Sequence, residues 1–166
     1  MRKLFQSRII FVIAAVLVCA VGVIWAISPH FVGKVHATIN GTSNLLVTWK
    51  ETGLGNTVTI DYEAYTHATA TYVCVNHDGQ YPNAANKTTV SQTYSVSGKF
   101  KSGKIGNING AVMISPPGPG SFSCPPSQTL TLSDIGYFNI YVKDKTNDIT
   151  ESATPPDVTA DFFTHP

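Results

Sequence analysis

Hydrophobic and polar residues alternate with a period of two along most of the chain beyond residue 38. Leu45, Val47 and Trp49, for example, stand at every second position and are separated by Leu46 and Thr48. This spacing is typical of a strand that buries one face. No window beyond the first 37 residues shows a convincing helical period. The segments with strand character are 45–50, 57–64, 68–76, 88–100, 106–114, 130–132, 137–143, 149–152 and 158–163.

Turn and loop signals separate these segments. Gly103 lies between 88–100 and 106–114, and we predict that these two strands form a hairpin. Residues 77–87 contain Asp-Gly and Tyr-Pro-Asn and are expected to form a long loop. Residues 115–127 hold five prolines and two glycines, which exclude a regular element. The sequence therefore predicts an all-β chain, an antiparallel immunoglobulin-like β-sandwich of about seven to nine strands.

The N-terminal segment has a different character. Met1–Arg8 is short and basic, and Ile9–Ile27 contains no charged residue. This combination is typical of a secretory signal peptide or of a membrane-anchor helix. Val35 and Ala37 suit a signal-peptidase site, so we expect cleavage before Thr38, with retention as an anchor as the alternative. Because basic residues precede the apolar run, the remainder is expected outside the cytoplasm in either case.

We accordingly divide the chain into residues 1–37, a signal peptide or anchor, and residues 38–166, a secreted β-sandwich domain. Removing the first part leaves seven lysines against ten acidic residues, a net charge of −3. A weakly acidic domain lacks the excess of positive charge that nucleic-acid binding requires. The membrane is expected to be a partner only through the N-terminal segment.

Two of the three cysteines lie in the predicted domain. Cys19 falls within the apolar leader, which leaves Cys74, in a predicted strand, and Cys124, in the Pro-rich loop. An oxidising compartment favours a bond between them. Closing a loop of about 50 residues contributes roughly 4 kcal/mol in the chain-entropy model. We therefore predict a Cys74–Cys124 disulfide that matters for folding.

Several short motifs between residues 72 and 148 together form a recognisable pattern. They include Cys74-Val75-Asn76, Pro82-Asn83-Ala84-Ala85-Asn86, Ser97-Gly98-Lys99-Phe100, Phe122-Ser123-Cys124-Pro125-Pro126 and Asn139–Asp148. This pattern resembles a family of small, uncharacterised secreted proteins of actinomycetes and related Gram-positive bacteria. The resemblance implies a secreted all-β domain with one disulfide. It implies no activity, so no functional residues are carried over from it.

Candidate catalytic and metal-binding groups are few. Asp61 and Glu63 stand two apart on a predicted strand, so their carboxyl groups would lie about 7 Å apart on one face. That distance is near the short end for an inverting glycosidase. A cluster with His67 in a deep pocket would favour an enzyme, but a solvated strand face is the simpler interpretation. We predict no metal site and no cofactor, because no Cys or second His stands at metal-ligand spacing from His77.

Aromatic residues supply a more specific candidate. In the strand predicted around residue 140 the even-numbered residues are apolar, so Tyr137, Asn139 and Tyr141 are expected on the outer face. Tyr81 and Phe122, each in a predicted loop, would extend that surface. Aromatic rings with an amide between them can stack on sugar rings, although Tyr is also simply a good strand residue.

Three classes of function remain after these observations. The first is a non-catalytic, secreted or cell-surface β-sandwich with a structural or protein-interaction role in the cell envelope. Its partner would be an envelope protein or, through an exposed sheet edge, a second copy of the chain. The alternative is a carbohydrate-binding module that binds an envelope polysaccharide; a hydrolase is the least favoured interpretation.

Overall fold

A computed structural model describes residues 28–76 and 86–162, and all regular structure in these residues is β. No helix in these two ranges is long and apolar enough to cross a membrane. The predicted leader helix and Tyr81 lie outside the described residues. The strands are β1 (His30–Phe31), β2 (His36–Ile39), β3 (Leu45–Thr52), β4 (Thr59–Val75), β5 (Lys87–Lys101), β6 (Ile108–Ile114), β7 (Thr129–Asp144), β8 (Ile149–Ser152) and β9 (Val158–Asp161).

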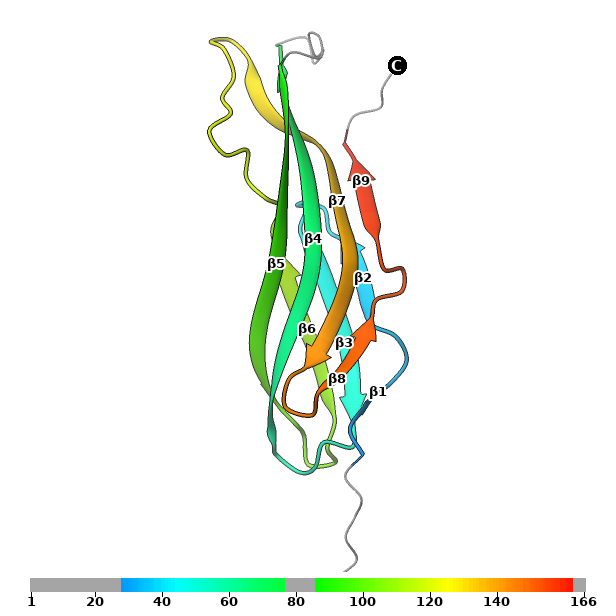
Figure 1. The fold of residues 1–166 in the computed structure, drawn as a ribbon. Helices are drawn as coiled ribbons and strands as arrows, with labels where there is room; N and C mark the ends of the chain where they lie inside the picture. Colours follow the sequence, from blue (N-terminus) through cyan, green and yellow to red (C-terminus); the bar gives the residue numbers. More distant parts are fainter. Residues whose placement is uncertain (1–27, 77–85, 163–166) are drawn as a thin grey trace, which may run out of the picture.

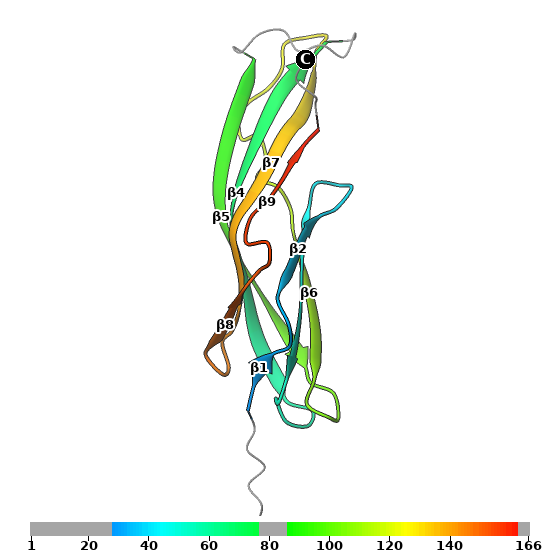
Figure 2. The same cartoon turned by 90° about the vertical axis from the view of Figure 1, so that its right-hand side faces the viewer.

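The strands form two antiparallel sheets that face each other (Figures 1 and 2). In the smaller sheet β3 is central: β1 and β2 follow one another along one of its sides, and β6 pairs with the other. In the larger sheet β4 and β7 are central, β5 flanks β4, and β8 and β9 flank β7. The prediction of an all-β domain built as a two-layer antiparallel sandwich is therefore confirmed for the described residues.

Two strands are much longer than the sequence predicted. The segments expected at 57–64 and 68–76 join into β4, of 17 residues, and those at 130–132 and 137–143 join into β7, of 16. Thr66 lies between the two halves of β4 and is fully buried. Its hydroxyl donates to the carbonyl oxygen of Phe138 at 3.1 Å, so the strand continues through a polar residue at an inward position.

The predicted hairpin around Gly103 is wrong. β5 pairs with β4 in the larger sheet, whereas β6 pairs with β3 in the smaller one. The segment between them therefore crosses from one sheet to the other (Figure 1). Ser102 holds this crossing in place, because its backbone N–H donates to Val58 O and its hydroxyl donates to Gly55 O, both at 2.8 Å.

The folded domain begins earlier than Thr38, so the predicted boundary between residues 37 and 38 is too late. β1 and β2 pair with β3, and Val35 is completely buried. The N–H of Thr154 donates to Val35 O at 2.9 Å and joins the edges of the two sheets. A cut after Ala37 would remove these interactions; whether a leader is cleaved stays a prediction.

Aromatic side chains form the core where β3, β4 and β5 meet near the end of β3. Trp49 of β3 packs against Tyr62 of β4 and Phe100 of β5, with ring centroids 5.1 and 5.2 Å away. Gly110 of β6 makes room for the indole, since a Cβ there would lie 2.1 Å from the nearest ring atom. The odd-numbered residues of β3 therefore face inward, as the alternation predicted.

At the other end the larger sheet extends beyond the smaller one, and the Pro-rich loop lies beside it (Figure 1). Tyr72 of β4 donates its hydroxyl to Pro117 O of this loop at 2.8 Å. The predicted disulfide is confirmed: Cys74 and Cys124 are bonded, with their Cα atoms 5.5 Å apart. The loop replaces a strand over this part of the inner face, and the disulfide holds it there.

Candidate functional site

Tyr137 does not lie on the outer face, contrary to the sequence prediction. It is fully buried, and its hydroxyl donates to Ser43 O at 2.9 Å. Burial raises the pKa of this hydroxyl well above its ordinary value. The cause of the inversion is a bulge in β7: the pairing with β4 shifts between Tyr65 and His67, opposite Asn139, whose φ is 54°. A bulge adds one residue to a strand and so exchanges its two faces.

Tyr141 does lie on the outer face, but its neighbours differ from those predicted. Its ring stacks on Tyr65 of β4, with centroids 4.8 Å apart and planes at 15°. Phe138, predicted to face the core, instead lies over Gly136, where a Cβ would come within 2.5 Å of the ring. We call Tyr65, Phe138 and Tyr141 the aromatic patch. Tyr65 is an odd-numbered residue of β4, like Asp61 and Glu63, so the alternation along this strand could have placed it on the outer face. Nothing in the sequence indicates the bulge that moves Phe138 to that face.

The remaining predicted ligand-binding residues do not form one surface with the patch. Asn139 is exposed at the bulge, and its N–H donates to an Asp157 carboxylate oxygen at 2.8 Å. Phe122 is half-buried in the Pro-rich loop. That loop covers the inner face of the larger sheet, whereas the patch lies on its outer face. Tyr81 lies outside the described residues.

Asp61, Glu63 and His67 lie half-buried on the outer face of β4. The alternation predicted this for Asp61 and Glu63. Glu63 accepts hydrogen bonds from Ser95 on β5 and lies 3.8 Å from the ammonium of Lys145. The ring of His67 contacts the hydroxyl of Thr93 on β5 at 3.2 Å. These contacts tie β5 to β4, which is a structural role.

An acidic pair lies inside the sandwich. Glu51 of β3 and Asp144 of β7 are both fully buried. One Glu51 oxygen accepts the Tyr62 hydroxyl at 2.7 Å, and the other has no hydrogen-bond partner among the described residues. Asp144 accepts from the backbone N–H groups of Thr146 and Asn147 at 2.7 and 3.0 Å.

Burial, together with the negative charge of Asp144, raises the pKa of Glu51 to about 7. The hydrogen bond from Tyr62 acts in the opposite direction but is the smaller effect. Glu51 therefore keeps its proton to a much higher pH than an ordinary glutamate does. The pair faces the packed core and not solvent, so its chemistry concerns stability.

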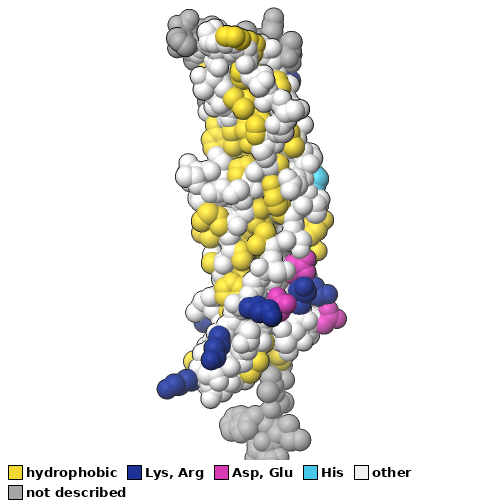
Figure 3. All heavy atoms as spheres, turned by 90° about the vertical axis from the view of Figure 1, so that its left-hand side faces the viewer, with side chains coloured by type: hydrophobic (Ala, Val, Ile, Leu, Met, Phe, Trp, Pro, Cys, Tyr) yellow, Lys and Arg dark blue, Asp and Glu magenta, His cyan; other side chains and the backbone are white. Residues whose placement is uncertain are grey.

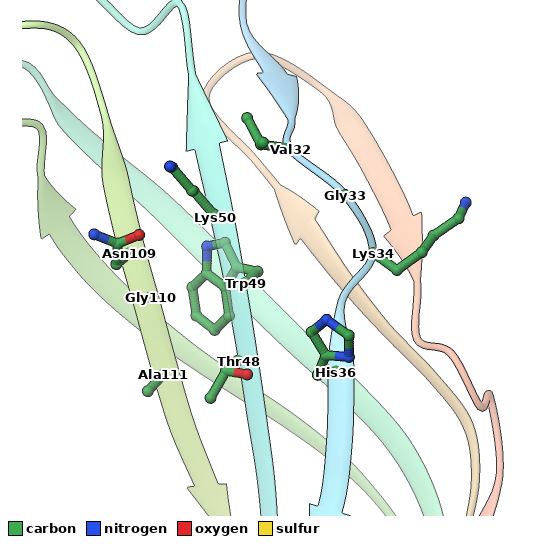
Figure 4. Close-up of a pocket in the computed structure, with 10 residues that line it drawn as sticks. All are labelled: Val32, Gly33, Lys34, His36, Thr48, Trp49, Lys50, Asn109, Gly110 and Ala111. Atoms are coloured by element: carbon green, nitrogen blue, oxygen red, sulfur yellow. The ribbon is translucent and has the colours of Figure 1, made fainter.

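A shallow depression of about 500 Å³ lies on the outer face of the smaller sheet (Figure 4). Lys50 of β3, Asn109 of β6 and His36 of β2 stand around it. Lys34 points away toward β8, where its ammonium lies 2.6 Å from a Glu151 carboxylate oxygen. Backbone and small side chains form most of the remaining lining, so the depression offers few directed groups to a ligand.

The outer edge of β5 is the most extensive unpaired feature of the described residues. β5 pairs with β4 over all 15 residues without a register shift and has no strand on its other side. Its residues between Lys87 and Lys99 carry no charge. Figure 3 looks onto this side, on which the Pro-rich loop also lies beside the upper part of the larger sheet (Figure 1). Hydrophobic side chains, prolines included, follow the length of the molecule, and most charged side chains gather at one end. Val96 and Phe100 are among the half-buried residues of β5 on its inner face.

The fold and these surfaces define a disulfide-bonded, two-sheet β-sandwich with a long open sheet edge. No family model, curated protein or solved structure matches this chain. A function for it must therefore be argued from the surfaces themselves.

Proposed function

We propose that the chain is a non-catalytic β-sandwich, located outside the cytoplasm, that acts through protein interaction or as a structural component of the cell envelope. The observation that carries the proposal is the open edge of β5. An unpaired edge presents a row of backbone N–H and C=O groups to which an extended segment can add as a further strand. The disulfide supports an oxidising compartment.

The strand order supports an immunoglobulin-like domain. If β1 and β2 count as one interrupted strand, the smaller sheet contains the first, second and fifth strands. The larger sheet contains the fourth, third and sixth, followed by β8 and β9 as an interrupted seventh. This is the immunoglobulin arrangement in which the fourth strand pairs with the third. Such domains commonly serve in adhesion and assembly, an analogy of fold alone.

A photo-crosslinking amino acid at Thr93 tests the interaction role in cells. Thr93 is exposed on β5, and Thr150, exposed on β8 at the opposite edge of the same sheet, is the matched control site. We expect Thr93 to give crosslinked protein species at several times the yield of Thr150. Equal or negligible yields at both sites would contradict the proposal.

The aromatic patch supports carbohydrate binding as the second candidate. Tyr65, Phe138 and Tyr141 present rings on the outer face of the larger sheet, and apolar ring faces stack on sugars. We expect Phe138→Ala and Tyr141→Ala to weaken retention on insoluble envelope polysaccharide several-fold, with Thr150→Ala as the control. Unchanged retention in both aromatic variants would exclude the patch as a sugar-binding site.

A further inference from the structure

We propose that the partner of the β5 edge is a second copy of this chain, bound so that the two β5 strands pair antiparallel about a two-fold axis at Ser95. The inference rests on the proposed interaction function and adds the identity of the partner and the register. It joins the two larger sheets into one continuous sheet. The two-fold symmetry makes the contact isologous, the commonest form of dimer interface.

The first argument is that β5, between Lys87 and Lys99, lacks the features that protect natural sheet edges. Proteins block edge pairing with short strands, prolines, bulges or charged side chains. On the other side of the larger sheet, β8 and β9 have four residues each and are separated by a segment containing Pro155 and Pro156. β2 also has four residues. β6, the remaining edge, is also free of charge, proline and register shift, but it has seven residues against 15 in β5. Among the edges of the described strands, β5 therefore offers the longest such run.

The second argument is that pairing covers hydrophobic surface. On the inner face of β5, Tyr94, Val96 and Phe100 pack against the core but stay partly exposed. In the register centred on Ser95, Tyr94 faces Val96 of the second copy and Val90 faces its Phe100. Cross-strand pairs of aromatic and β-branched side chains stabilise antiparallel sheets.

The third argument selects the register. A two-fold axis at Thr93 would place Lys87 opposite Lys99, and an axis at Tyr94 would place Lys87 opposite Lys101. Like charges directly opposite each other are destabilising. An axis at Ser91 avoids this clash but pairs only residues 87–95.

The axis at Ser95 pairs residues 89–101 and places a hydroxyl group opposite each lysine. Thr89 faces Lys101 of the second copy, and Ser91 faces its Lys99. This register therefore combines the longest pairing without opposed lysines and the aromatic pairs described above.

The size of the contact sets the expected affinity. Thirteen paired residues span about 44 Å, and a contact about 10 Å deep buries roughly 900 Å² over both copies. That area lies just below the minimum of about 1,000 Å² expected of a stable interface and well below the typical value of about 1,600 Å². We therefore expect a reversible, concentration-dependent dimer with a micromolar dissociation constant.

Site-specific thiol crosslinking of the full chain tests the register. Ser95→Cys, in a Cys19→Ser background that removes the leader thiol, places two thiols across the axis, with Cβ atoms about 5 Å apart. Ser91→Cys is the matched control, since the same register separates its two copies by about 27 Å. With a short bis-maleimide we expect at least tenfold more covalent dimer from Ser95→Cys, and mass spectrometry should find residue 95 joined to residue 95.

A pair of charge variants in the Ser95→Cys background separates pairing from any effect on folding. Both Ser91→Glu and Ser91→Lys remove the contact of Ser91 with the Thr69 hydroxyl, at 3.2 Å in the wild type. In the dimer, however, the new glutamate faces Lys99 of the second copy, whereas the new lysine opposes it. We expect at least fivefold more crosslinked dimer from Ser91→Glu than from Ser91→Lys.

Each outcome decides the proposal. Equal crosslinking at residues 91 and 95, no covalent dimer, or the same yield from the two charge variants would overturn self-pairing in this register. Conjugates of Ser95→Cys with other proteins alone would overturn the second copy as partner and leave the proposed interaction function intact. The absence of any conjugate here, together with no crosslink from Thr93 in cells, would overturn both.

Discussion

Replacing Glu51 by Gln should make the domain more stable at alkaline pH and remove part of its pH dependence. Glu51 is fully buried between the sheets, close to the acidic Asp144. Gln has nearly the same size, accepts the Tyr62 hydroxyl with its carbonyl oxygen, and carries no charge at any pH. It therefore reproduces the protonated form of the wild-type residue.

The magnitude follows from the difference between the folded and unfolded states. The pKa of Glu51 is about 7 in the folded chain, against an ordinary value of 4.5. Between these pH values the folded state binds the extra proton, so Glu51 favours folding below about pH 4.5. This contribution is lost as the pH rises through 7. A difference of about 2.5 pKa units corresponds to roughly 3 kcal/mol in the free energy of unfolding.

Urea unfolding followed by circular dichroism between pH 5 and 8.5 measures this effect. Wild type and Glu51→Gln should have similar free energies of unfolding near pH 5, and the variant should be more stable by about 3 kcal/mol at pH 8.5. Asp161→Asn, which removes an exposed carboxylate, is the control and should follow the wild type. A constant difference between wild type and Glu51→Gln at all pH values would refute a proton bound at Glu51.

Three further predictions concern packing and chain boundaries. Gly110→Ala should lower the free energy of unfolding by about 1–3 kcal/mol, because the added methyl group would overlap the Trp49 ring. Urea unfolding measures this change, and an unchanged unfolding midpoint would contradict it. A chain starting at Ser28 should fold. A chain starting at Thr38 lacks the buried Val35, and its free energy of unfolding should be lower by at least about 2 kcal/mol. Equal melting temperatures of the two chains would contradict this. Verified reduction of the disulfide, which closes a loop of 50 residues, should cost up to about 4 kcal/mol and lower the melting temperature markedly.

Local alternation was sufficient to predict much of the fold. The odd-numbered residues of β3 face the core, as their spacing indicated, because a strand with one buried face must place its apolar residues at every second position. The same reasoning placed Asp61 and Glu63 outside. The disulfide could be predicted because only two cysteines lie beyond the leader and an oxidising compartment was expected. Neither argument depends on where the strands begin and end.

The aromatic surface could not be predicted in the same way. One bulge at Asn139 reverses the two faces of β7, so that Tyr137 enters the core and Phe138 leaves it. Asn adopts a positive φ more readily than most residues, but the residue type alone does not say that it does so here. The position of the bulge depends on the pairing with β4, which is a long-range property of the sheet.

The error about the hairpin and the proposal about the β5 edge have one physical origin. The residues from Thr88 to Ser97 are mostly Ser, Thr and Val, with no charge and no proline. Such a sequence is compatible with pairing on either side, and the turn around Gly103 then suggests a partner that is merely close in the sequence. In the fold, β5 uses one side for β4, and its hydroxyl groups contact those of β4 at Thr69 and Thr71. Because β6 joins the other sheet, no strand within residues 28–76 and 86–162 pairs with the second side of β5. The features that would protect this edge are absent from the residues between Thr88 and Ser97.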